Sequence, residues 1–108
     1  MKTEEGNKLI ADFMGMKYNP ELKRAFIDGK WRYRTLHFDT DWNWMMSAVK
    51  KVEATDDGYY DVRIMGSYCE ILTLDEDVIV QMSERENPKI TATWLAVVEF
   101  IEWYNTQK

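Results

Sequence analysis

Two apolar runs joined by a glycine-serine pair predict a β-hairpin between residues 59 and 74. The runs are YYDVRIM and YCEILTL, and Gly66 occupies the first loop position, where a two-residue type II′ turn requires glycine. This turn fixes a register in which apolar residues face each other on one side of the hairpin and opposite charges meet on the other. The pairs are Ile64 with Cys69, Val62 with Ile71, and Arg63 with Glu70.

Further strands are predicted on both sides of this hairpin. A strand from Val78 to Met82 follows the acidic turn Asp75-Glu76-Asp77, so the hairpin extends into an antiparallel meander. Upstream, WRYRTLHF has the aromatic and β-branched composition of a strand, although its alternation slips between Tyr33 and Leu36. We expect this segment, Trp31 to Phe38, to extend the meander, with a bulge or an edge position at the slip.

The first thirty residues divide into a helix and a connection. The apolar spacing predicts a helix from about Thr3 to Met14, which Gly15 ends by supplying a left-handed residue. From Met16 to Lys30, the turn signals Asn19-Pro20 and Asp28-Gly29 indicate a connecting segment that holds no more than a short irregular piece.

The stretch DTDWNWMMSAVKKVE, residues 39–53, could begin either a calcium loop or a helix. A calcium loop of the EF-hand type needs glycine at its sixth position and glutamate at its twelfth, but Trp44 and Lys50 stand there. We therefore expect Asp39, Thr40 or Asp41 to cap a helix. The apolar face of this helix consists of Trp42, Met45, Ala48, Val49 and Val52.

A last helix is predicted after Pro88, because apolar residues recur there at spacings of four, three, four and three. This apolar stripe consists of Ile90, Trp94, Val97, Ile101 and Tyr104.

Four large apolar residues fall outside the predicted core faces: Trp44 and Met46 beside the middle helix, and Leu95 and Trp103 on the back of the last one. Either a further layer of the protein covers them, or they form a surface that contacts a partner. If a partner is involved, we expect a host or phage protein or a second copy of the chain.

The 108 residues are expected to form a single domain, because this length suffices for one core. The predicted class is α+β: an antiparallel meander of three to four strands packed with three helices, in the order α-(β)-α-β-β-β-α. A membrane span is not expected, because Glu or Thr interrupts each apolar segment. The single Cys69 and the absence of an apolar leader are typical of a cytoplasmic protein.

No pattern typical of catalysis or of cofactor binding is found, so we expect a non-enzymatic protein without a cofactor. His37 has no second imidazole or thiolate with which to complete a zinc site. Cys69 falls on the apolar face of the predicted hairpin, which suits a core residue better than a nucleophile. The serines lack the glycine-flanked elbow of a hydrolase, and the five glycines form no phosphate-binding pattern.

Nucleic acid is an unfavourable partner for the chain as a whole. Its 14 Lys and Arg residues against 19 Asp and Glu residues give a net charge of −5, which opposes binding to phosphates. The alternative function is single-stranded nucleic-acid binding by one segment whose aromatic and basic side chains alternate. This segment consists of Lys30, Trp31, Arg32, Tyr33 and Arg34, which also suit an edge strand protected by charge.

Three segments, NKLIADFMGMK, DTDWNWMMSAVKKVE and ITATWLAVVEFIEWYN, together resemble a group of small proteins of unknown function from bacteriophages and from bacteria of the Bacteroides and Flavobacterium kind. They cover about two fifths of the chain. The resemblance implies a phage α/β sandwich domain, with helices packed on a small antiparallel sheet, and an origin in a phage or prophage. It supplies no catalytic residue.

Overall fold

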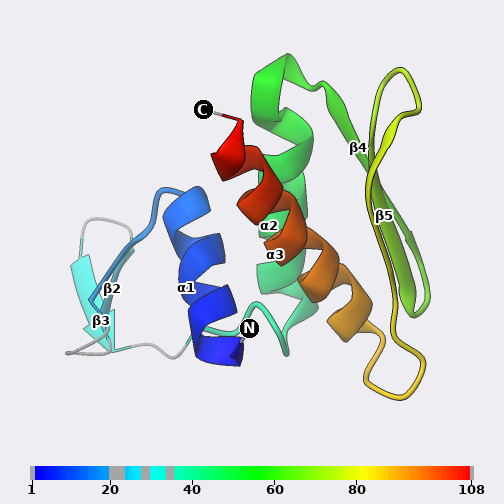
Figure 1. Ribbon diagram of the computed structural model, residues 1–108. Helices are drawn as coiled ribbons and strands as arrows, with labels where there is room; N and C mark the ends of the chain where they lie inside the picture. Colours follow the sequence, from blue (N-terminus) through cyan, green and yellow to red (C-terminus); the bar gives the residue numbers. More distant parts are fainter. Residues whose placement is uncertain (1, 20–23, 28–29, 34–35, 108) are drawn as a thin grey trace.

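Three helices lie on one side of a three-stranded antiparallel sheet in the computed structural model of the chain (Figure 1). The structure describes the backbone of residues 2–19, 24–27, 30–33 and 36–107, and the side chains of residues 2–16 and 36–107. The predicted α+β class, a meander packed with three helices, is confirmed. The radius of gyration of the Cα atoms is 13.8 Å, close to the value of about 13 Å for a compact chain of this length.

The described chain forms three helices and two antiparallel sheets of three strands each. The helices are α1 (Thr3–Phe13), α2 (Trp42–Ala54) and α3 (Ile90–Thr106), and α2 continues into a short 3-10 turn, η1 (Thr55–Asp57). The meander consists of β4 (Tyr60–Met65), β5 (Tyr68–Thr73) and β6 (Val78–Ser83). A second small sheet, seen beside α1 in Figure 1, consists of β1 (Lys17–Asn19), β2 (Arg24–Ile27) and β3 (Lys30–Tyr33).

The β4–β5 hairpin has the register predicted from the sequence. Gly66 begins its turn with a φ of +60°, a value that a side chain would strain. The pairing sets Val62 opposite Ile71 and Ile64 opposite Cys69 on the side that faces the helices. The short loop and the alternation of apolar residues therefore suffice to fix this part of the fold.

The predicted extension of the meander by Trp31 to Phe38 is wrong. The strand found there, β3, pairs with β2 in the small sheet, and the chain from Leu36 to Phe38 forms no strand. Leu36 and Phe38 are buried in the main core, and the slip in alternation itself falls at residues 34–35, which lie outside the described residues. The interpretation of Met16 to Lys30 as a connection is also wrong, because β1 and β2 lie within it.

The end of α1 is formed as the sequence predicts, and one of the three candidate caps begins α2. Gly15, with a φ of +77°, ends α1, and Met16 donates its backbone N–H to the Ala11 carbonyl at 2.9 Å in a Schellman arrangement. The Asp41 carboxylate caps α2 by accepting a hydrogen bond from the Asn43 backbone N–H at 2.8 Å.

Helix α3 lies against β5 and β6, beside α2, which lies against β4. It contacts β5 and β6 on one side, and α1 and α2 on the others (Figure 1). A helix with neighbours on several sides needs apolar residues around most of its circumference. Its buried residues are Ile90, Ala92, Thr93, Trp94, Ala96, Val97, Val98, Phe100 and Ile101.

A buried hydrogen-bond network joins α1 to α3 and to the segment before α2. The Trp94 indole N–H donates to the Asn7 side-chain oxygen at 2.8 Å. The Asn7 amide nitrogen in turn donates to the Leu36 carbonyl at 3.1 Å and to the Asp39 carboxylate at 2.8 Å. Gly6 lies against the Trp94 ring, so both the glycine and the amide are needed where α1 meets α3.

Candidate functional site

Three of the four predicted contact residues pack against the protein itself. Trp44 is half-buried, with its ring edge-to-face against Phe38 at a centroid distance of 5.1 Å. Trp103 is half-buried against Phe100, at 5.9 Å between ring centroids, and Leu95 also packs on the core. Met46 is 40% exposed.

Trp42 differs from its predicted position on the buried face of α2, because it is also 40% exposed. It is the first residue of α2, and the first buried residue of the helix is Met45. The apolar face of α2 therefore begins one turn later than the sequence pattern indicates.

The segment of the nucleic-acid alternative is described only in part. The backbone of Lys30–Tyr33 forms β3, which pairs with β2 alone among the described strands and is thus an outer strand. Arg34 and the side chains of Lys30, Trp31, Arg32 and Tyr33 lie outside the described residues. The predicted edge position is confirmed, and the contact with nucleic acid stays a prediction.

The side chains that could act in catalysis or bind a metal do not form a common site within the described residues. His37 is exposed, with its ring edge-to-face against Trp44 at 5.6 Å. Cys69 is fully buried in the core as predicted, and burial raises the pKa of its thiol to about 11, which opposes formation of a nucleophilic thiolate. Within the described ranges, no three His, Cys, Asp or Glu side chains gather closely enough to hold a metal ion.

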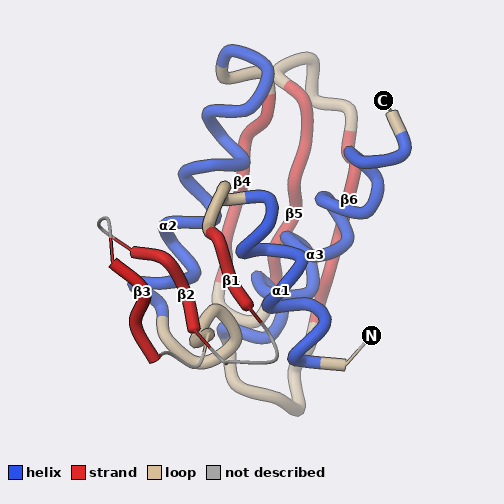
Figure 2. Tube along the Cα trace, turned by 90° about the vertical axis from the view of Figure 1, so that its left-hand side faces the viewer, coloured by secondary structure: helices blue, strands red, loops and turns tan. Residues whose placement is uncertain are grey.

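The side of the meander that faces away from the helices is the first surface with potential for binding. Figures 1 and 2 show the helices on the opposite side of the β4–β6 sheet. Of the six large apolar side chains that are exposed in the described part of the chain, four belong to the meander or its turns, and Met65 and Leu74 are the most exposed, at 61% and 64%. The other two of these four are Tyr59 and Val78.

Charged side chains occupy the middle of this surface. Arg63 donates to the Asp61 carboxylate at 3.1 Å and lies 3.8 Å from the Glu70 carboxylate. The exposed apolar residues therefore lie toward the two ends of the sheet, with an ion-paired strip between them.

Strand β6 is an edge of the meander, since it pairs only with β5 in the described structure. The hydrogen bonds between β5 and β6 show which backbone groups of β6 are free. Glu84 donates its N–H to the Ser67 carbonyl at 2.9 Å, and in an antiparallel pair every second residue counted from Glu84 is likewise hydrogen-bonded to the partner strand. Met82, opposite Cys69, is bonded to β5, whereas Gln81 and Ser83 direct their N–H and C=O groups away from the sheet.

The composition of β6 does not protect this edge. Its sequence, VIVQMS, contains neither a charged residue nor a proline, which are the usual means of preventing another strand from pairing. Charge appears only outside the strand. The acidic run Asp75-Glu76-Asp77 precedes it and Glu84-Arg85-Glu86 follows it, so both ends of the edge have a net negative charge.

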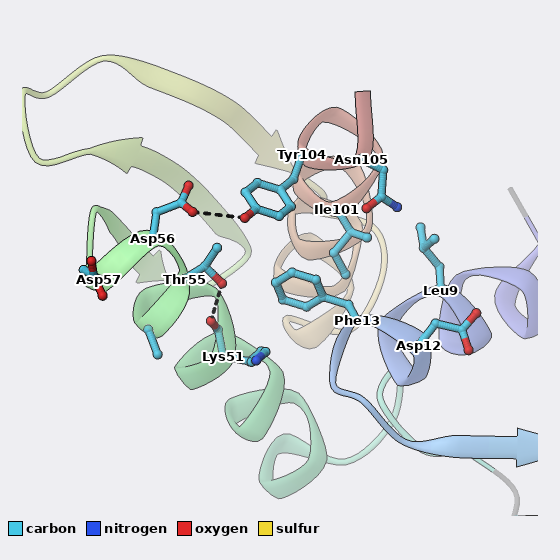
Figure 3. Close-up of a pocket in the computed structure, with 11 residues that line it drawn as sticks. Leu9, Asp12, Phe13, Lys51, Thr55, Asp56, Asp57, Ile101, Tyr104 and Asn105 are labelled. Atoms are coloured by element: carbon cyan, nitrogen blue, oxygen red, sulfur yellow. Dashed lines mark hydrogen bonds between the residues drawn. The ribbon is translucent and has the colours of Figure 1, made fainter. Parts of the chain in front are cut away.

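An open cleft of about 730 Å³ is the second surface (Figure 3). It lies between the C-terminal parts of α1, α2 and α3 and the η1 turn. Apolar side chains form its middle, and polar and charged side chains surround them (Figure 3). The lining residues are Leu9, Asp12, Phe13, Lys51, Ala54, Thr55, Asp56, Asp57, Ile101, Tyr104 and Asn105.

Asp56 connects this cleft to the sheet and to α3. Its carboxylate accepts hydrogen bonds from the Tyr60 hydroxyl at 3.1 Å and from the Tyr104 hydroxyl at 3.0 Å. Burial and the bond to Asp56 raise the pKa of Tyr60 to about 12, and the bond to Asp56 raises the pKa of Tyr104. Asp56, Asp57 and Gly58 have positive φ values of 52°, 58° and 84°, so a left-handed turn brings the carboxylate to the two phenols.

Neither the β6 edge nor the cleft was evident from the sequence. The strand β6 was predicted, but its position at the edge depends on where the other strands pair. The cleft combines side chains from three helices that are distant in the sequence.

Comparison of the chain with protein-family models, with curated proteins and with solved structures finds no match. Among the helices of the described residues, none has the combination of length and apolar character needed to cross a bilayer.

Proposed function

We propose that this protein is a non-enzymatic interaction module of phage or prophage origin that binds a host or phage protein at the β6 edge. The single observation that carries the proposal is the outward-facing backbone of Gln81 and Ser83 on an uncharged edge strand. A partner segment in an extended conformation would form main-chain hydrogen bonds with these groups and add a strand to the sheet. The exposed side chains of Val78 and Leu74 then provide apolar contacts beside the new strand.

The charges around β6 indicate the chemistry of the partner segment. Three acidic residues precede the strand, and two acidic residues with one arginine follow it. A second copy of β6 in antiparallel pairing would bring these acidic ends together, which is unfavourable. The fitting partner is therefore an apolar, extended segment with lysine or arginine at both ends.

Affinity capture from the native host, with three versions of the protein as bait, tests this function. Gln81→Pro removes an N–H that points away from β5, and proline is tolerated at such edge positions. Gln81→Thr is the matched control, because it changes the same side chain and keeps the N–H. We expect the wild type and Gln81→Thr to retain the same protein, and Gln81→Pro to lose it while its circular dichroism and melting temperature show a folded domain.

Two results would contradict the proposal. Equal retention by Gln81→Pro would exclude the β6 edge as the contact, and the absence of any retained protein above a bait-free resin would count against protein binding altogether. The charge argument has its own check, in which the retained partner's segment is synthesised with its basic ends replaced by glutamate. This peptide is expected to bind several-fold more weakly at low salt than the natural one.

A further inference from the structure

The cleft between the helix ends has an apolar middle with carboxylates on both sides of it. Figure 3 shows Asp12 on the α1 side and Asp56 and Asp57 on the η1 side, with the side chains of Phe13 and Ile101 between them. The ring of Tyr104 borders the same space. A complementary ligand has two positive charges that are joined by an apolar chain.

The backbone around the cleft favours a cation as well. The C-terminal end of a helix has a partial negative charge, and the C-terminal parts of α1, α2 and α3 all border this space. Neither α1 nor α3 has a basic residue in its last turn that would offset this charge. The face of an aromatic ring, which Phe13 and Tyr104 can provide, also attracts a cation.

From these observations we propose that the cleft binds an aliphatic diamine or polyamine. The methylene chain lies across Phe13 and Ile101, one ammonium group faces Asp12, and another faces Asp56. Asp12 accepts a hydrogen bond from Lys8 at 3.1 Å, but both side chains are about half exposed, at 46% and 54%, so a ligand ammonium can replace that lysine at little cost. A metal ion fits less well, because the carboxylates stand apart and no group of three converges within the described residues.

Among the described residues that line the cleft, Lys51 is the one cation. Within the described chain it forms no ion pair with a carboxylate, and a bound ammonium group would be repelled by it. The proposal therefore predicts that Lys51 weakens binding, which gives a test that a loss of structure cannot imitate.

Titration of the 108-residue chain with three probes of equal chain length tests the proposal. The probes are hexane-1,6-diamine, hexylamine and hexane-1,6-diol, and binding is followed by calorimetry and by amide chemical shifts at low salt. We expect the diamine to bind about fivefold more tightly than hexylamine, as one added exposed ion pair would give. The diol should not bind, the shifts should map to the cleft, and the diamine's advantage should shrink as salt is raised.

Three variants assign the contacts. Asp12→Asn is expected to remove the fivefold advantage of the diamine, and Lys51→Gln to strengthen diamine binding by about threefold. Glu86→Gln is the matched control, because it neutralises an exposed carboxylate outside the cleft, and it should leave the affinity unchanged. Asp56 is left intact, since its carboxylate also holds two tyrosines.

The proposal is overturned if no probe binds, if the diamine and hexylamine bind equally to the wild type, or if Lys51→Gln weakens diamine binding. Shifts that cluster away from the cleft would overturn it as well. These outcomes are independent of partner binding at β6, because none of the cleft residues belongs to that strand.

Discussion

Replacing Gly6 with alanine tests the packing of α1 against α3, because the added Cβ would lie 2.3 Å from the Trp94 Cζ2 atom and 2.6 Å from Cη2. Such distances are too short for carbon atoms, so the ring or the helix must move. Trp94 is only 6% exposed, and its indole N–H is bonded to Asn7 at 2.8 Å. The ring therefore has little freedom to move without loss of that bond.

Two opposing effects decide the expected magnitude. Alanine at a helix-interior position is more favourable than glycine by about 1 kcal/mol of unfolding free energy. Overpacking costs about 1–3 kcal/mol, and loss of the buried Trp94–Asn7 bond costs about 1–2 kcal/mol more. We therefore expect Gly6→Ala to lower the free energy of unfolding by about 2 kcal/mol, and the melting temperature by roughly 10 °C.

Urea denaturation, followed by circular dichroism and tryptophan fluorescence, measures this loss. Glu5→Ala is the control, because Glu5 is exposed on the same turn of α1 and should change stability by less than about 0.5 kcal/mol. In a Trp94→Phe background the smaller ring leaves room for the methyl group, so Gly6→Ala should cost less there. A stability gain from Gly6→Ala in the wild type, as helix propensity alone would give, would refute the reasoning.

Three further predictions concern other parts of the molecule. Asp41→Ala removes the cap of α2 and should lower the free energy of unfolding by about 1 kcal/mol in urea denaturation. Thr40→Ala is the control and should have little effect. Equal effects of the two substitutions would contradict the role of Asp41 as the cap. The contribution of Tyr60 to stability should be constant up to about pH 10 and fall toward pH 12, because its pKa is raised in the folded state from 10.0 to about 12 and the unfolded chain loses this proton first. Cys69, whose pKa is raised from 9.0 to about 11, should add a loss that begins near pH 9. Tyr60→Phe should flatten this fall in alkaline denaturation curves, and an unchanged curve would assign it to other groups. Titration with labelled single-stranded oligonucleotides at low salt should show no binding; salt-sensitive binding that vanishes in Arg32→Ala/Arg34→Ala would support the nucleic-acid alternative instead.

The sequence was most informative where interactions are local. The β4–β5 pairing depends on a two-residue loop and on alternation within a few residues, so its register could be predicted down to Arg63 opposite Glu70. The cap and the termination of a helix are likewise local, which explains why the sequence predicts Gly15 as the end of α1 and narrows the cap of α2 to three residues that include Asp41.

The remaining features depend on tertiary packing. Strands of three or four residues, as in the small sheet, are too short to show a clear alternation, so the sequence predicts a connection where β1 and β2 lie. Asn7 and Trp94 are separated by 87 positions, and no pattern in the sequence links them. The position of Leu95 on the back of α3 follows from the sequence, but the sequence does not decide between a further layer of the protein and a partner as its cover.

The contacts in the cleft also depend on tertiary packing. Asp56, Asp57 and Gly58 are of residue types that tolerate positive φ, so a turn at this place is a local property of the sequence. That the Asp56 carboxylate would meet Tyr60 and Tyr104 depends on how α3 crosses the sheet.

Amide hydrogen exchange within β6, measured by NMR on the isolated protein, tests the free sheet edge most directly. The ladder predicts slow exchange for Met82 and Val80, whose N–H groups face β5, and fast exchange for Gln81 and Ser83, whose N–H groups face away. Equally slow exchange of all four amides would mean that the edge is already covered, and partner binding by strand addition at β6 would then have to be abandoned.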